Sequence, residues 1–376
     1  MIRKYRLKDY NYRLVIYLAA LGMLGVLLVG SAWQPYERRQ LLGFVGGMIV
    51  MFIVSMIDYS WVLQFYWLMY AGNLALLLLV FAIGKNTNGA TRWIEIAGFK
   101  FQPVELAKII LILFFARYFM NEENRLSSFR TIVQSVILIT APLVLIFLQP
   151  DLKNTLTVLA LFAVMYFAAG LSYRAIGLIL LVTVPIAAVA IGIILQPDSG
   201  ILQDYQYERI MTHLQPDNDE YSGKAMQQKN SVIAIGSGGL TGKGLGNKEE
   251  ITANNGDFVA ESETDFIFSV AGEELGFVGS CGIILLLLLV VFECLYMSAR
   301  AKDLAGRVIC SGMACIVSLQ SFINIGVSCG LLPNTGTPLP FVSHGLTSML
   351  CLFIGMGFVL NVGLQARIRM EREEKA

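Results

Sequence analysis

The sequence predicts an all-α, polytopic membrane protein, and three properties of the chain lead to this fold class. Of the 376 residues, 56% are hydrophobic and only 15% are charged, whereas a soluble domain carries about a quarter charged residues. The mean hydropathy is +0.65, and apolar runs long enough to cross a bilayer recur along the chain. The net charge of +1 gives no electrostatic basis for binding nucleic acid.

Hydropathy predicts ten membrane-spanning helices. The first apolar run is long enough to span a bilayer and no A-x-A cleavage site closes it, so we expect an uncleaved first helix and not a signal peptide. The ten spans are expected near residues 14–33, 41–57, 61–84, 102–119, 131–148, 155–172, 175–195, 265–297, 306–331 and 341–364.

The distribution of lysine and arginine predicts the orientation of these helices. An even number of spans places both termini on the same side of the membrane. The N-terminus, the C-terminal tail and the loops on their side are rich in basic residues, so the positive-inside rule predicts that both termini are cytoplasmic. A large loop over about 196–264, between helices 7 and 8, and a smaller loop over 85–101 are then extracellular. No separate soluble domain is evident, so residues 1–376 are expected to form one membrane domain.

Asp265 lies where the large polar loop ends and the eighth predicted helix begins, in the segment AESETDFIFSVAGEELGF (Ala260–Phe277). A carboxylate at this junction is partly shielded from water and still within reach of a polar substrate. This suits a general base that acts on the head group of a lipid-linked substrate. The simpler interpretation is a carboxylate that accepts from the free N–H groups at a helix N-terminus. Both interpretations stay open at this point.

Glu105 and Lys108 lie within the fourth predicted span, in QPVELAKIILILFF. A charged residue at the centre of a membrane helix costs about 2.5–3.5 kcal/mol on insertion scales, so each needs a partner or a function. At a separation of three residues the two side chains share a helix face and are expected to form an ion pair one turn inside the outer surface. The pair either only neutralises itself near a helix end or also serves a cavity, and the two roles are compatible.

Four further polar residues are candidates for substrate binding on the outer side. Arg92, beside Trp93 in the smaller loop, has the planar guanidinium that binds phosphate in a bidentate manner, or else contacts lipid head groups. Arg209 in the large loop is usable against pyrophosphate, or else is a solvated charge. Gln102 lies near the cap of the fourth predicted helix, and Asp151 begins another outer loop, where capping or a turn is the alternative.

The last outer turn, NIGVSCGLLPNTGTPLPFVSHGLTS, contains Pro333, Pro338 and Pro340, so a helix cannot run through it. Irregular backbone at membrane depth is tolerated where it is buried in protein or lines a cavity. We favour a cavity wall over a packed corner, with Ser343 as a candidate substrate-binding residue.

The glycine-rich segment Ile235–Asn247 (IGSGGLTGKGLGN) does not match a phosphate-binding P-loop. Residue 237 is serine where the first glycine is required, and the residue after Lys243 is glycine instead of serine or threonine. The glycines predict either close packing or a mobile loop over a site. The six cysteines and two histidines indicate neither a disulfide framework nor a metal site.

These segments together resemble the SEDS family of shape, elongation, division and sporulation proteins. The resemblance covers nearly the whole chain and rests on six ordered motifs. They are NGATRWIEIAGFKFQPVELAK, LQPDL, the YERI of Tyr207–Ile210, AIGSGGLTGKGLGN, TDFIFSVAGEELGFVG and NIGVSCGLLPNTGTPLPFVSHG.

The resemblance implies ten membrane helices in the bacterial cytoplasmic membrane and the polymerisation of lipid II into glycan strands. It implies that the protein contacts membrane lipids and has a class B penicillin-binding protein as its partner. Carried over to this sequence, it makes Asp265 the essential aspartate of the outer loop, Glu105 and Lys108 the intramembrane acid–base pair, and Arg92 the loop arginine. The short N-terminus and compact length look more like the elongation branch, that of RodA, than the division branch.

The chain departs from the family pattern at several positions. Val104 replaces the usual serine of Q-P-S-E, and Lys153-Asn154 replace the Gly-Thr that usually follows Q-P-D-L. The usual L-P-E and S-Y-G-G read Val259-Ala260-Glu261 and Ser343-His344-Gly345-Leu346.

The residues and the resemblance together predict an inverting glycosyl transfer at the outer face. A sugar hydroxyl of the acceptor attacks the anomeric carbon of a sugar on undecaprenyl pyrophosphate, and Asp265 takes the proton. Arg92, Arg209 and a divalent cation, Mg²⁺ or Mn²⁺, would stabilise the leaving pyrophosphate. One alternative is a flippase for lipid-linked precursors, which requires polar residues toward the cytoplasmic half. The other is a non-catalytic scaffold for a penicillin-binding protein, in which Asp265 is dispensable.

Overall fold

The computed structural model describes residues 10–87, 90–96, 99–173, 177, 204–215, 222–247 and 259–373. Long helices make up most of this part of the chain, and the sheet content is small. The helices are α1 (Tyr12–Ala32), α2 (Gln34–Met56), α3 (Tyr59–Val62), η2 (Leu63–Phe65), α4 (Tyr66–Ile83), α5 (Pro103–Asn121), η3 (Glu123–Arg125), α6 (Phe129–Leu148), α7 (Leu152–Ala169), α9 (Asp204–Leu214), α10 (Ser222–Ser237), α11 (Ile267–Ala299), α12 (Leu304–Ser328) and α13 (Leu346–Glu373). The strands are β1 (Lys85–Thr87), β2 (Ala90–Ile96) and β3 (Phe99–Phe101).

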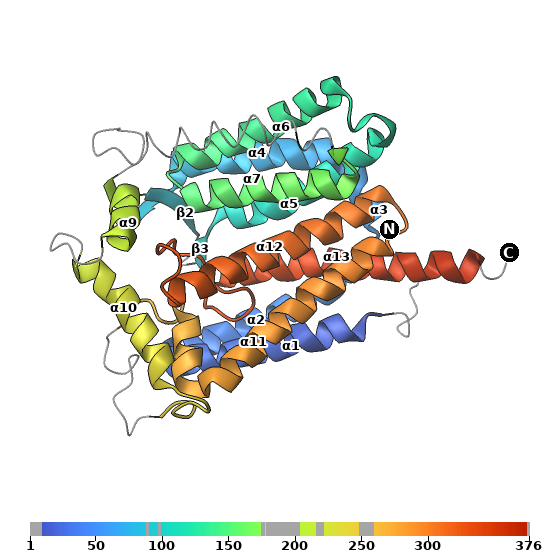
Figure 1. Cartoon of the computed structure of the whole chain (residues 1–376). Helices are drawn as coiled ribbons and strands as arrows, with labels where there is room; N and C mark the ends of the chain where they lie inside the picture. The colour runs from blue at the N-terminus through green and yellow to red at the C-terminus, as the bar shows by residue number, and fades with distance from the viewer. Residues whose placement is uncertain are drawn as a thin grey trace.

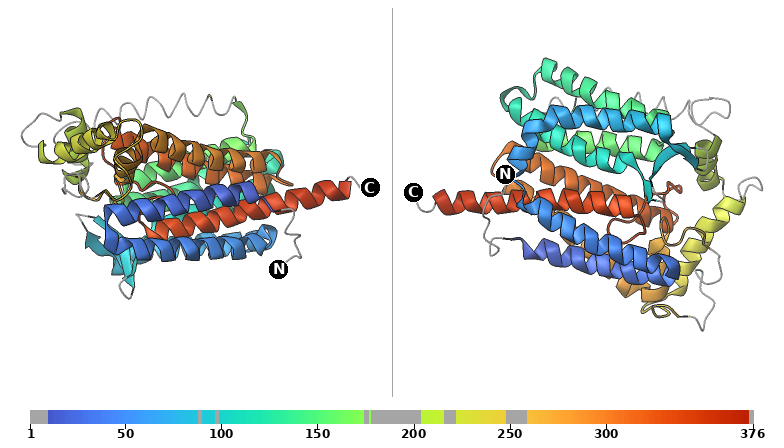
Figure 2. Two further views of the ribbon diagram at one scale, coloured as in Figure 1. Left: turned by 90° about the horizontal axis from the view of Figure 1, so that it is seen from below. Right: turned by 180° about the vertical axis from the view of Figure 1, so that it is seen from behind.

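The long helices lie roughly side by side in one bundle (Figures 1 and 2). α1 begins and α13 ends at the same end of this bundle. The opposite end carries the sheet, α9 and α10 (Figure 1). The two ends of the bundle therefore differ in character, and the end with the sheet carries the irregular and polar segments.

Nine of the ten predicted spans coincide with long helices in the described residues. Eight helical segments are long and apolar enough to cross a membrane, which makes the chain a multi-pass membrane protein. The ninth, α5, is 19 residues long and carries Glu105, Lys108 and Arg117. The predicted span over 175–195 lies outside the described residues except for position 177, as does much of the loop over 196–264. The count of ten helices therefore stays a prediction.

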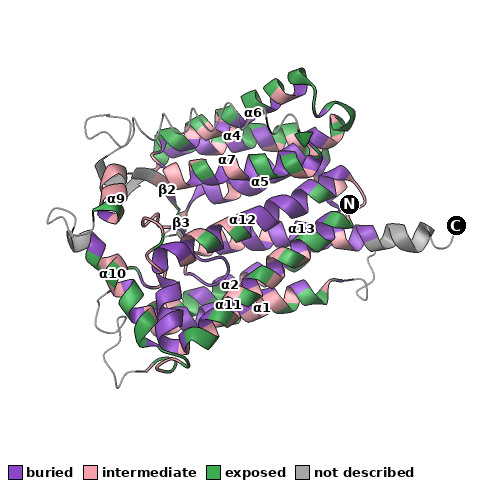
Figure 3. Cartoon of the chain, in the orientation of Figure 1, coloured by how far each residue is buried: buried purple, intermediate pink, exposed green. Residues whose placement is uncertain are grey.

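The core of the bundle is built around α12 and α13. In both, 72% of the residues of the apolar stretch are buried, against 28% in α6. Figure 3 shows the same division, with buried residues concentrated along α12 and α13 and exposed residues frequent on α6. α13 packs on α2, and α12 packs on α5, α7 and α11. The outer helices thus turn apolar side chains outward, as expected for contact with lipid.

The smaller predicted loop, over 85–101, contains a small antiparallel sheet of strand order β1-β2-β3 that the all-α prediction did not include. Ile94 pairs with Phe101 and Glu95 pairs with Lys100. Ile94 is buried and Glu95 is exposed, as the alternation of side chains along a strand requires. The sheet leads directly into α5 and fixes the positions of Arg92 and Lys100.

α11 is broken at Gly276, where φ is +66° and ψ is −163°. The glycine-rich loop, defined here as residues 238–247, fills the gap that this break leaves in the helical hydrogen bonding. Four backbone bonds cross the break: Lys243 N–H to Glu273 C=O and Gly244 N–H to Glu274 C=O (both 3.0 Å), Phe277 N–H to Gly239 C=O (2.9 Å) and Val278 N–H to Leu240 C=O (3.1 Å). A Cβ on Gly242 would overlap the Glu274 carbonyl. The sequence predicted either close packing or a mobile loop for these glycines. In the structure they allow close packing of the loop against α11.

Candidate active site

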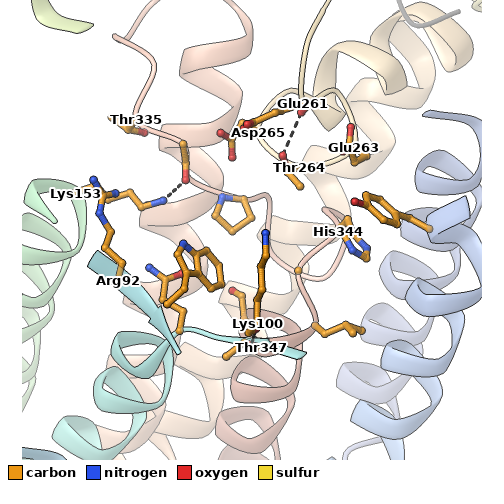
Figure 4. Close-up of a pocket in the computed structure, with 18 of the residues that line it drawn as sticks. Arg92, Lys100, Lys153, Glu261, Glu263, Thr264, Asp265, Thr335, His344 and Thr347 are labelled. Carbon is orange, nitrogen blue, oxygen red and sulfur yellow. Dashed lines mark hydrogen bonds between the residues drawn. The ribbon is translucent and has the colours of Figure 1, made fainter. Parts of the chain in front are cut away.

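A cavity of about 710 Å³ lies at the end of the bundle that carries the sheet. Its walls come from the start of α2, the sheet, the first turn of α7, α9, the segment before α11 and the loop before α13 (Figure 4). Among the described residues, five cationic and three carboxylate side chains line it, which suits an anionic, phosphate-bearing ligand. They are Arg39, Arg92, Lys100, Lys153 and Arg209, and Glu261, Glu263 and Asp265.

Asp265 lies on the cavity wall two residues before α11. Its N–H donates to the carbonyl of Glu261 (3.1 Å), and its own carbonyl accepts from Asn324 Nδ2 of α12 (2.9 Å). The residue at the N-cap position of α11 is Phe266, and no side chain caps this helix. Asp265 therefore does not act as the helix cap that the simpler interpretation of the sequence required.

The cavity changes the ionisation of Asp265. Burial raises the pKa of its carboxyl from 3.8 to about 6 because the charged form is partly removed from water. The positive charges of Lys153 and Arg209 oppose this rise, and the negative charge of Glu261 adds to it. A carboxyl with a pKa near 6 is still mostly ionised at neutral pH, and it is a stronger base than an ordinary aspartate.

Glu105 and Lys108 pair in the first two turns of α5, with Lys108 Nζ 2.7 Å from Glu105 Oε1. Both side chains are buried. Lys108 also donates to Asn154 Oδ1 of α7 (3.4 Å), and Ser348 of α13 donates to Glu105 Oε2 (3.0 Å). The pair lies behind the cavity wall and joins three helices, so it supports the wall and does not form it.

Arg92 and Asp151 connect the sheet to α7. Arg92 Nη1 lies 3.9 Å from Asp151 Oδ1, and Gln102 Nε2 donates to Asp151 Oδ2 (3.4 Å). Asp151 is the N-cap of α7, where it accepts from the N–H of Asn154 (3.4 Å). Arg92 and Gln102 are on the cavity wall, whereas Asp151 is buried behind it. Asp151 therefore has the capping role that the sequence offered as the alternative, and its contact with substrate stays a prediction.

Ser343 forms two hydrogen bonds with backbone groups. Its hydroxyl donates to the carbonyl of Thr264 (2.6 Å) and accepts from the N–H of Leu339 (2.8 Å). The side chain is buried and is not part of the cavity wall. Ser343 ties the proline-rich loop to the Asp265 segment, and its contact with substrate stays a prediction. The loop itself does line the cavity, through Gly336 and Pro338 among others.

Sequence reasoning missed several wall residues, of which Lys153 is the most prominent. Lys153 is in the first turn of α7, and its Nζ donates to the carbonyl of Gly336 in the proline-rich loop (Figure 4). Lys100 of β3 and Arg39 of α2 add two further cations. The sequence drew attention to Lys153 only through its place two residues after Asp151 and its departure from the Gly-Thr of the family pattern. In a predicted loop, a solvated lysine is the ordinary expectation.

A stacked aromatic pair closes the side of the cavity opposite Lys153 (Figure 4). The rings of Tyr36 and His344 are 4.3 Å apart and nearly parallel, at 7°. The ring nitrogen Nδ1 of His344 lies 3.2 Å from Gln40 Oε1. The backbone N–H of His344 donates to the carbonyl of Glu263 (2.8 Å). Burial lowers the pKa of the imidazole, and the positive charge of Arg39 lowers it further. His344 therefore stays neutral around pH 7 and offers a flat surface.

The side chains do not fit a metal cage made of protein ligands alone. In the part of the chain that the structure describes, no group of three or more His, Cys, Asp and Glu residues is placed to hold a metal ion. Mg²⁺ at phosphate-binding sites is held by one or two carboxylates together with the phosphates of the substrate.

Fold and cavity together define a class of protein: a multi-pass membrane protein with a cation-rich site around one aspartate at one end of its helix bundle. The model of the FtsW/RodA/SpoVE family, described as cell cycle protein, matches residues 10–368. The chain therefore belongs to this family, the one that its motifs resemble.

Relatives with known names agree with this assignment. The chain is 33% identical to the "Probable peptidoglycan glycosyltransferase FtsW" of Geobacter metallireducens, over 97% of this chain and 98% of that protein. It is 37% identical to the peptidoglycan glycosyltransferase MrdB of Escherichia coli K12, over 76% of this chain and 74% of that one. A chain from a study titled "Structural coordination of polymerization and crosslinking by a peptidoglycan synthase complex" matches with a TM-score of 0.77 and 28% identity, over 94% of this chain and 97% of that chain.

Proposed function

We propose that this protein is a peptidoglycan glycosyltransferase that polymerises lipid II at the outer face of the bacterial cytoplasmic membrane. Relatives with this enzyme's name align over most of the chain. The observation that carries the proposal is Asp265, a carboxyl of raised pKa that faces Lys153 and Arg209 in the cavity. Lipid II offers what such a cavity recognises: a sugar hydroxyl for the base and a pyrophosphate for the cations.

The reaction is an inverting displacement. The acceptor hydroxyl oxygen attacks the anomeric carbon of the donor sugar, and Asp265 accepts the hydroxyl proton. The bond from the anomeric carbon to the pyrophosphate oxygen breaks, and the undecaprenyl pyrophosphate leaves with the bonding electrons. This leaving group is already ionised, so it needs cations more than an acid. Arg92 and Arg209 on the cavity wall supply them.

The buried network behind the wall positions these groups. Glu105 and Lys108 hold Asn154 and Ser348, and Asn154 holds Asp151 (2.8 Å), which faces Arg92. The intramembrane pair thus acts on the reaction through the orientation of Arg92. Any divalent cation, Mg²⁺ or Mn²⁺, enters with the pyrophosphate of the substrate.

The cavity is at the extracellular end of the bundle and both termini are cytoplasmic. The basic residues at the termini support this orientation, as does the position of α1 and α13 relative to the cavity (Figure 1). A class B penicillin-binding protein is the proposed partner, and the match to a chain of a peptidoglycan synthase complex supports it. The elongation branch is the proposed cellular role.

The test is polymerisation of labelled lipid II by the purified full-length protein in detergent, read as glycan polymer on a gel. We expect the parent to form polymer and Asp265→Asn to lose about 10²–10⁴ in rate, because the change removes the base and almost nothing else. Size-exclusion chromatography of both proteins is the control for folding. A variant as active as the parent would contradict the mechanism, and a parent that translocates lipid II across liposomes without polymerising it would favour the flippase.

A further inference from the structure

Lys153 occupies an unusual place in the cavity. It is the second residue of α7, at the outer end of a membrane helix, and its side chain lines the cavity wall. Its Nζ donates to the carbonyl of Gly336. α7 is thereby attached to the proline-rich loop at Gly336, a residue that lies close to the Asp265 carboxylate.

Three charged side chains from different elements converge on Gly336. A Cβ placed on Gly336 would lie 3.1 Å from Asp265 Oδ2 and 3.6 Å from Arg209 Nη1, while Lys153 holds the carbonyl of the same residue. Gly336 has a φ of +67°, which L side chains rarely adopt. This position is therefore restricted to glycine on two grounds, and the restriction lets Asp265 approach the loop closely.

The other charges near this point have partners of their own. Arg92 of β2 faces Asp151, and Lys108 of α5 is paired with Glu105. The charges that act on the ionisation of Asp265 include Lys153 from α7, Arg209 from α9 and Glu261 from its own segment. Those that act on Lys153, besides Asp265, include Asp151, Glu105 and Arg92. Glu263, Lys100, Arg39 and His344 share the cavity.

We propose that Lys153 is a further positioning residue of the glycosyl transfer, which holds Gly336 against Asp265 and places a positive charge in the cavity beside that carboxylate. The inference rests on the proposed function. A nearby cation favours the ionised form of a carboxylate, and a general base works only in that form. Lys153 acts through Asp265 and does not itself need to touch the substrate.

The test is the pH dependence of lipid II polymerisation by Lys153→Met, Lys153→Gln and Lys153→Arg in the full-length protein. Loss of the cation raises the pKa of Asp265, so the acid limb of Lys153→Met should move about one pH unit or more toward higher pH. Lys153→Gln keeps a donor for Gly336 without the charge and should show the same shift, even if Lys153→Met fails to fold. Lys153→Arg should restore the parental limb.

Lys100→Met is the matched control. It removes a cation of the same cavity that is not among the main groups that shift the pKa of Asp265, so its acid limb should stay close to that of the parent whatever its rate. An acid limb that is the same in the parent, Lys153→Gln and Lys153→Met would overturn the inference. Asp265→Asn distinguishes a failure of the inference about Lys153 from a failure of the proposed function. If Asp265→Asn is inactive, the general-base mechanism stands and only the role of Lys153 is overturned. If Asp265→Asn is active, the proposed mechanism itself fails.

Discussion

The ionisation of Asp265 determines the pH range in which the cavity can accept a proton. Burial raises the pKa of this carboxyl to about 6, and a general base works only when deprotonated. The rate of polymerisation is therefore expected to fall as the pH is lowered through about 6, and not through the ordinary value of 3.8. Initial rates of the purified parent between about pH 4.5 and 8 check this. An acid limb centred near the ordinary value would contradict it.

The sequence predicted Asp265, Lys108 and Arg92 but not Lys153. Asp265 and Lys108 are charged residues in or beside apolar runs, where an unpaired charge is costly and therefore informative, and Arg92 stands out beside Trp93. Lys153 is in a segment that the sequence predicts as a polar loop, where the local sequence does not separate a cavity residue from a solvated one. Ser343 was selected for its place after three prolines, but the backbone groups that it bonds come from another segment, which only the fold brings close.

The break in α11 depends on a backbone conformation that essentially only glycine adopts. Gly276 combines a φ of +66° with a ψ of −163°, and other residues in this region cost about 1–3 kcal/mol. Gly276→Ala is therefore expected to lower the thermal unfolding midpoint of the purified protein, measured by intrinsic fluorescence. Gly282→Ala, in the same helix, is the control because its Cβ would meet open space and alanine favours a helix. Equal midpoints for the two variants would contradict the role of Gly276.

The start of α5 depends on the neutrality of its buried pair. Lys108→Ala leaves Glu105 charged and unpaired inside the bundle, and breaking such a pair costs about 3–5 kcal/mol. The double variant Glu105→Gln with Lys108→Met removes both charges. We expect the single variant to accumulate less folded protein than the double variant, measured as the monodisperse fraction in size-exclusion chromatography. If both accumulate equally, the 2.7 Å pair does not stabilise the fold.

Most apolar helices could be predicted to within a few residues because hydropathy measures what the membrane selects. The exceptions are helix ends with polar residues, such as the start of α2 at Gln34 and the end of α13 at Glu373. The sheet over 85–101 could not be predicted, since its strands β1 and β3 have three residues each and both form only by pairing with β2. The break in α11 also escaped prediction, because a hydropathy profile does not register a change of backbone dihedral angles at one glycine.

The bundle as a whole has a polar end with the cavity and an opposite end where α11 meets α12. Lys100 is exposed at the first end and Arg300 at the second. If the cavity is extracellular, a membrane-impermeant maleimide added to intact cells should label Lys100→Cys and not Arg300→Cys. Labelling of Arg300→Cys after lysis is the control for reactivity, and the unsubstituted protein, with its six free cysteines, gives the background. The reverse pattern would invert the proposed topology.

The glycine-rich loop connects the two parts of α11 across the break at Gly276. It bonds to carbonyls before Gly276 and to N–H groups after it, so the two parts of α11 keep a fixed angle for as long as the loop is seated. Asp265 precedes the first part by two residues and moves with it. Removal of the loop from this position would leave the helical hydrogen bonds around Gly276 unsatisfied and would free the segment that carries Asp265 to move.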